Sequence, residues 1–175
     1  MGIAADYRGP LGKILPGVKI NATEITEKLR PLFTQRKEAV LAYLFGSYAQ
    51  GKARETSDID VAVLLEPDVK GEKLYDVYRD LFLSICEALG TERFDLVLLN
   101  RAPLSLRFEI VSQGKLIYAR DEETLNGFEI DVIRKYQDTA YLRAVQDQYL
   151  KERVRQWYSK ERASNSERAQ AAKGY

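Results

Sequence analysis

The chain has 175 residues, of which 45% are hydrophobic and 30% charged, a composition typical of one globular domain with a sizeable core. Its 27 Lys and Arg nearly balance 26 Asp and Glu, so a net charge of +1 gives no overall attraction for nucleic acid or an anionic membrane. The absence of histidine and the presence of one cysteine exclude histidine-based triads, histidine-ligated zinc and an internal disulfide.

Catalysis by this chain would therefore have to use carboxylates, hydroxyls, cations and metals. The single cysteine, Cys86, falls in an apolar helical pattern, which predicts a buried structural thiol rather than a nucleophile. No apolar run is long enough to span a membrane, and the N-terminus lacks an apolar signal core. We expect a cytoplasmic protein with no membrane partner.

The N-terminal part of the chain changes character near residue 20. Residues 1–20 contain four glycines and two prolines, which predict an irregular arm. A helix is expected to begin at Asn21–Glu24, where Asn21 or Thr23 can cap it. Apolar residues then recur at helical spacing, namely Ile25, Leu29, Leu32 and Phe33. Pro31 lies within this pattern and predicts a kink or a split.

Two short apolar runs around a polar segment form the centre of the sequence. Ala39–Phe45 and Asp58–Leu65 have the length of buried strands. The Gly46-Ser47 pair predicts a turn after the first strand, followed by a short helix from Tyr48 that ends near Gly51.

The second of these strands begins with two aspartates, Asp58 and Asp60. Residues i and i+2 of a strand point to one face, so their carboxylates should lie side by side and repel each other. A divalent cation removes that repulsion, and oxygen ligands favour Mg²⁺. Gly46 permits a close backbone approach, and Ser47 offers a hydroxyl and an N–H to a phosphate.

Each piece has a plainer interpretation when taken alone. Asp-x-Asp is common in solvated turns, and Gly-Ser is a common loop pair. At this spacing, with both pieces flanked by apolar strands, the combination favours a binding site. Lys52 and Arg54 lie between the two halves, where they either steady a triphosphate or form a solvated basic loop.

A third carboxylate appears farther along the chain. An apolar helical pattern runs from Glu72 to Leu89, with Gly90 as its stop, and the next strand is Arg93–Asn100. Asp95 interrupts that apolar strand. If the strand lies beside the second one, Asp95 completes a cluster with Asp58 and Asp60; the alternative is a strand-end aspartate that faces water.

The C-terminal third is predicted to be mostly helical. A helix Leu104–Gln113 and a strand Lys115–Arg120 complete a domain over residues 21–120. A long amphipathic helical segment follows over residues 121–158, packed on the domain or on a partner, and Gly127 is a point at which it would break. Residues 159–175 form a charged tail.

The arrangement Gly46-Ser47, ten residues, Asp58-x-Asp60 resembles the signature of the nucleotidyltransferase superfamily that includes DNA polymerase β. Within it, the compact chain is similar to the minimal nucleotidyltransferase (MNT) antitoxins that pair with HEPN-domain toxins. The resemblance is good over residues 41–118 and poor at both ends. It implies an α/β (α+β) fold with a small mixed sheet flanked by helices, and a third acid at Asp95.

The resemblance also implies a function. An MNT antitoxin is expected to transfer AMP from ATP to a tyrosine of its cognate HEPN ribonuclease toxin and so neutralise it. Asp58, Asp60 and Asp95 would then be catalytic and bind two Mg²⁺ ions, and Gly46 and Ser47 would bind the nucleotide. The expected partner is the toxin, in a hetero-oligomer, without direct binding of nucleic acid.

Two other functions remain open on the sequence. One is transfer of a nucleotide to a small molecule, as in the enzymes that adenylylate aminoglycosides. The other is an antitoxin that neutralises by binding alone, for which the long C-terminal segment with Tyr136, Tyr141, Tyr149 and Trp157 would supply the interface.

Overall fold

The computed structural model describes residues 20–171, and side chains through residue 158. The predicted irregular arm, apart from residue 20, lies outside the described residues. Helices and strands follow in the order α1 (Ala22–Thr34), β1 (Ala39–Phe45), α2 (Gly46–Ala49), β2 (Ile59–Leu65), α3 (Gly71–Leu89), β3 (Phe94–Leu98), α4 (Leu104–Gln113), β4 (Lys115–Ala119), α5 (Glu122–Asp138) and α6 (Ala140–Ala171).

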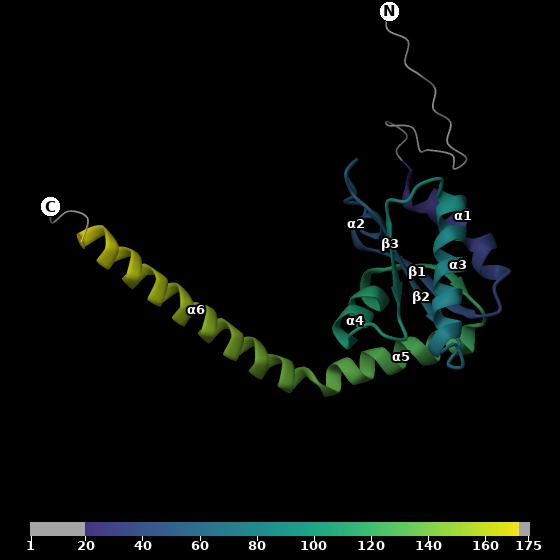
Figure 1. Cartoon of the computed structure of the whole chain (residues 1–175). Coiled ribbons are helices and arrows are strands. Elements are labelled where there is room, and N and C mark those ends of the chain that lie inside the picture. Colours follow the sequence, from purple (N-terminus) through teal and green to yellow (C-terminus); the bar gives the residue numbers. More distant parts are fainter. Residues whose placement is uncertain (1–19, 172–175) are drawn as a thin grey trace, which may run out of the picture. The chain divides into compact units, whose positions relative to one another are not determined.

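The four strands form one mixed sheet in the order β3-β2-β1-β4. Strands β1, β2 and β3 are labelled in Figure 1. Strand β1 is antiparallel to both β2 and β4, whereas β2 and β3 are parallel and are joined through α3. A parallel pair needs such a crossover connection, and the 19-residue α3 provides it. The predicted α/β fold with a small mixed sheet is confirmed.

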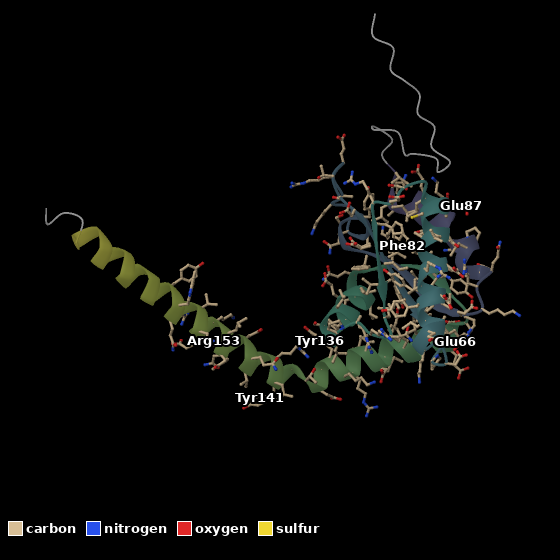
Figure 2. All side chains as sticks on the ribbon, viewed as in Figure 1. Glu66, Phe82, Glu87, Tyr136, Tyr141 and Arg153 are labelled. Atoms are coloured by element: carbon tan, nitrogen blue, oxygen red, sulfur yellow. The ribbon has the colours of Figure 1, made fainter. Side chains whose placement is uncertain are left out.

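Apolar side chains cover both faces of the sheet. Helices α1 and α3 pack on one face through a buried cluster that includes Ile25, Leu29, Phe33, Leu81, Ile85 and Leu89. On this face the rings of Phe82 of α3 and Phe94 of β3 have centroids 4.7 Å apart. Phe82 is labelled in Figure 2. A second cluster on the other face joins Tyr43 and Ala62 to Ile110 of α4 and to Leu125 and Phe128 of α5. The alternation along β2 therefore directs odd-numbered residues toward α1 and α3 and even-numbered residues toward α4 and α5.

Most helix boundaries follow their sequence signals. Asn21 caps α1 by accepting bonds from the backbone N–H groups of Thr23 and Glu24, and Glu24 returns a bond to the Asn21 N–H. Gly90 ends α3 in the left-handed conformation, with φ of 69°. Cys86 is buried, as predicted.

Three local predictions need correction. Of the two outcomes predicted for Pro31, the split does not occur, because α1 runs without interruption from Ala22 to Thr34 with Ile25, Leu29 and Phe33 buried in the core. The short helix α2 begins at Gly46 itself and not at Tyr48. Gly127 lies inside a continuous α5, and the interruption comes at Thr139.

Packing explains why α5 tolerates Gly127. A glycine within a helix costs about 1 kcal/mol relative to alanine. Against this, Leu125 and Phe128 pack on the sheet, Val132 is buried, and the hydroxyl of the buried Tyr43 donates to Glu129 at 2.9 Å. Burial of these side chains outweighs the glycine penalty.

The chain divides into two compact units between Ile133 and Arg134. The second unit contains α6, which continues to Ala171 and so into the segment for which the sequence predicts a charged tail. Tyr141, Tyr149 and Trp157 are exposed, and the Tyr141 and Arg153 side chains extend from α6 in Figure 2. Among the described residues, no helix is long and apolar enough to cross a membrane.

Candidate active site

Strand pairing brings two of the three predicted aspartates together. In the parallel pair of β2 and β3, Asp60 lies directly opposite Asp95, so their side chains project from the same face of the sheet. Asp58 comes two residues before Asp60, immediately ahead of β2, and belongs to that face as well. The three carboxylates therefore lie at the edge where β2 and β3 begin.

Gly46 lies against this edge from the end of β1. Phe45, the last residue of β1, pairs with Asp60, and Gly46 follows with φ of +65°. A Cβ atom built on Gly46 would lie 2.0 Å from Oδ2 of Asp60 and 2.8 Å from its Cγ. Only glycine allows both this backbone conformation and this approach to the carboxylate.

The electrostatics of the edge are those of crowded carboxylates. Burial raises the pKa of Asp60, and the neighbouring charges of Asp95 and Asp58 raise that pKa further. Asp58 and Asp95 are exposed while Asp60 is half-buried. The site is thus open to solvent on one side and confined around Asp60 on the other.

An arginine that the sequence analysis did not single out contacts this edge. The Arg93 guanidinium donates through Nη2 to the Thr56 carbonyl at 2.7 Å, and its Nε lies 3.4 Å from Oδ1 of Asp58. Arg93 directly precedes β3 and lies two residues before Asp95, and this spacing was the sequence signal that could have placed the two side chains on the same face.

The loop between α2 and β2 is a closed turn. The Arg54 N–H donates to Oγ of Ser57, and the Ser57 N–H donates back to the Arg54 carbonyl, both at 2.9 Å. The Lys52 ammonium donates to the Gln50 side chain at 3.1 Å, so in this structure it is bonded within its own segment. Ser47 is the second residue of α2 and is half-buried.

The donor set fits a hard divalent cation. Carboxylate oxygens are the ligands that Mg²⁺ prefers. Burial first, and then the charges of Asp95 and Asp58, raise the pKa of Asp60, and a bound cation would favour its charged form. Among the side chains that the structure describes, no three acidic or cysteine groups are placed so that together they could hold a metal ion. The Asp58 carboxylate is paired with Arg93, whereas Asp60 and Asp95 are strand neighbours.

Comparison with known proteins identifies a family and two relatives. The family profile described as polymerase beta, nucleotidyltransferase matches residues 27–123. The protein adenylyltransferase MntA of Shewanella oneidensis is 34% identical over 122 residues, which cover 68% of this chain and 79% of the relative. A putative protein adenylyltransferase of Methanocaldococcus jannaschii, MJ1547, is 29% identical over 85 residues, 49% of this chain and 60% of that protein.

Solved structures give the same result at the level of the fold. One is a toxin–antitoxin complex with AMP-PNP, at 31% identity and a TM-score of 0.56, with 75% of this chain and 99% of that chain covered. Another contains a tri-AMPylated HEPN toxin of Shewanella oneidensis with its MNT antitoxin, at 26% identity and a TM-score of 0.52, with 73% and 97% covered. The profile match spans more than half of the chain, and the chain therefore belongs to the polymerase β-type nucleotidyltransferase family.

Proposed function

We propose that this protein is an antitoxin that transfers AMP from ATP to a tyrosine of a cognate HEPN ribonuclease toxin. The observation that carries the proposal is the contact of Gly46 with Asp60, beside Asp95 on the adjacent parallel strand. Its similarity to MntA and to an MNT antitoxin in complex with an AMPylated HEPN toxin supports AMP as the transferred group and a protein as the acceptor.

In this proposal the residues around the starts of β2 and β3 have two roles, binding of phosphate and binding of metal. Gly46 and Ser47 bind the phosphates of ATP, because the glycine leaves room for a close approach and the serine offers a hydroxyl and an N–H. Asp58, Asp60 and Asp95 hold the metal ions. Bound Mg²⁺ would neutralise charge on the triphosphate and lower the pKa of the attacking hydroxyl.

The reaction exchanges one bond at phosphorus for another. The tyrosine hydroxyl oxygen of the toxin forms a bond to the α-phosphorus of ATP, and the bond from that phosphorus to the oxygen bridging to the β-phosphate breaks. Pyrophosphate leaves with the electron pair of the broken bond. Asp95, which is exposed beside Asp60, accepts the phenolic proton.

The modification silences the toxin through charge and bulk. An adenylyl group adds a phosphodiester with negative charge beside the ribonuclease site. That charge repels the phosphates of an RNA substrate, whose binding depends on attraction to a positive surface.

The decisive experiment is the intact mass of the toxin after incubation with ATP, Mg²⁺ and this protein. We expect mass increments of one adenylyl group with the wild type and none with Asp58→Ala/Asp60→Ala. Asp76→Ala is the matched control, because Asp76 is an exposed aspartate of α3 that pairs with Arg79.

Two outcomes would reject the proposal. An unchanged toxin mass with the wild-type protein would exclude AMP transfer to that acceptor. Full neutralisation of the toxin by Asp58→Ala/Asp60→Ala, in a stable complex, would instead establish an antitoxin that acts by contact alone.

A further inference from the structure

Arg93 makes contacts that no part of the proposed reaction yet uses. Its guanidinium reaches three residues of the loop before β2, with Nη2 2.7 Å from the Thr56 carbonyl, Nη1 3.5 Å from the Glu55 carbonyl and Nε 3.4 Å from Oδ1 of Asp58. Its backbone carbonyl also accepts from the N–H of Ile59 at 3.2 Å. Arg93 therefore connects the start of β3 to the whole segment that leads into β2.

These contacts contribute little to the stability of the fold. The side chains of Arg93 and Asp58 are each 57% exposed, and an ion pair so open to water is weak because solvent screens it. The guanidinium instead fixes the orientation of the groups that it contacts, because its planar set of donors binds acceptors on three residues at once. A lysine at this position keeps the charge but has no planar set of donors.

Asp58 needs such support because of its place in the chain. It precedes the first residue of β2, so the β2–β3 ladder begins only after it, at the pairing of Ile59 with Phe94. The turn of Arg54 and Ser57 closes the loop from the other end. The Arg93 guanidinium contacts two backbone carbonyls inside that turn and the Asp58 carboxylate just after it.

We propose that Arg93 is a positioning residue, which fixes the loop before β2 and orients the Asp58 carboxylate toward the metal-binding edge. The inference rests on the proposed function, because it takes Asp58 as a metal ligand. Groups that orient a metal ligand typically change metal affinity or activity by about 10- to 100-fold when they are removed.

The test separates orientation from charge. Arg93→Lys retains the positive charge, and Arg93→Ala removes both charge and donors. We expect both variants to bind Mn²⁺ at least about tenfold more weakly than wild type in calorimetric titrations of the full-length protein, and to require correspondingly more Mg²⁺ for AMP transfer. Arg79→Ala, an exposed arginine of α3 paired with Asp76, should bind Mn²⁺ as the wild type does.

A double-mutant cycle with Asp58→Asn distinguishes positioning from a general structural effect. If Arg93 acts through Asp58, Arg93→Lys should weaken Mn²⁺ binding much less in the Asp58→Asn background than in the wild type. Equal losses in the two backgrounds would contradict action through Asp58. Thermal unfolding of each variant, compared with Arg79→Ala, checks that the fold is retained.

The outcomes also separate this inference from the proposed function. If Arg93→Lys binds Mn²⁺ as tightly as the wild type does, the positioning role is overturned, because positive charge alone would then suffice. If the wild type does not bind Mn²⁺ at all, the positioning role is overturned as well. A wild type that binds Mn²⁺ but leaves the toxin mass unchanged would reject the acceptor, while the affinities of the Arg93 variants would still decide the positioning role.

Discussion

Replacement of Gly46 by alanine should remove activity while leaving the protein folded. The backbone at Gly46 has φ of +65°, and a non-glycine residue in this region costs about 1–2 kcal/mol. The new Cβ would also lie 2.0 Å from Oδ2 of Asp60, whereas ordinary contact begins at 3.4 Å, so the carboxylate must move by the difference, about 1.4 Å. A misplacement of about 1 Å in a reacting group can reduce the rate by about 100-fold, and we expect at least that loss.

Gly51 provides a matched control for this substitution. It has nearly the same backbone conformation, with φ of +69°, but an added Cβ would meet nothing within 4 Å. Gly51→Ala should therefore lose a similar amount of stability and retain AMP transfer. Gly71→Ala, with φ of +57° and open space around it, tests the same point farther along the chain, at the start of α3.

The assay is the initial rate of incorporation of labelled AMP from ATP into the toxin, together with the unfolding temperature of each variant. The reasoning predicts one pattern, in which all three variants lose comparable stability and only Gly46→Ala loses the reaction. An active Gly46→Ala protein would show that the carboxylate of Asp60 does not depend on this contact. Loss of activity in Gly51→Ala to the same degree would show that backbone strain is the cause.

Two further predictions concern stability. The raised pKa of Asp60 means that its charged form destabilises the folded, metal-free protein, so Asp60→Asn should unfold at a higher temperature than wild type at pH 7 in chelator. The difference in unfolding temperature should shrink as the pH falls through the raised pKa, because wild-type Asp60 then takes up a proton. It should vanish below 3.8, the pKa of Asp60 in the unfolded chain. A difference that does not depend on pH would contradict the electrostatic cause. The Asn100 side chain accepts a hydrogen bond from the Leu65 N–H and donates one to the Leu65 carbonyl, both at 2.8 Å. Asn100→Ala should therefore lower the free energy of unfolding, measured in urea titrations, by about 1–3 kcal/mol. AMP transfer per folded molecule should not change. A loss of activity without loss of stability would place Asn100 in the site instead.

The sequence by itself determined the elements and the chemistry that they offer. Apolar runs separated by Gly, Pro and polar turns place β1, β2, α3 and α4 within a few residues of their observed bounds, because local patterns of period 2 and 3.6 are properties of the chain. The absence of histidine restricts any catalysis to carboxylates, hydroxyls, cations and metals, and Asp58 and Asp60 are the candidate carboxylates. These conclusions need only residue types and their spacing.

Some boundaries depended on packing that no local pattern contains. Gly127 is a weak point of α5 on propensity alone, but burial of Val132 and the bond between Tyr43 and Glu129 keep the helix intact there. Pro31 similarly lies inside a continuous α1, whose Ile25, Leu29 and Phe33 side chains are buried in the core. Tertiary contacts outweighed local preference in both cases.

Only the tertiary structure decided how the parts of the site meet. The parallel register of β2 and β3 brings Asp60 beside Asp95, which are 35 positions apart in the sequence, and the end of β1 brings Gly46 against the Asp60 carboxylate. The contact of Arg93 with Asp58 arises from that same register. Strand register is set by long-range pairing and burial of opposite faces, so residue spacing named the candidates but could not say which atoms would lie together.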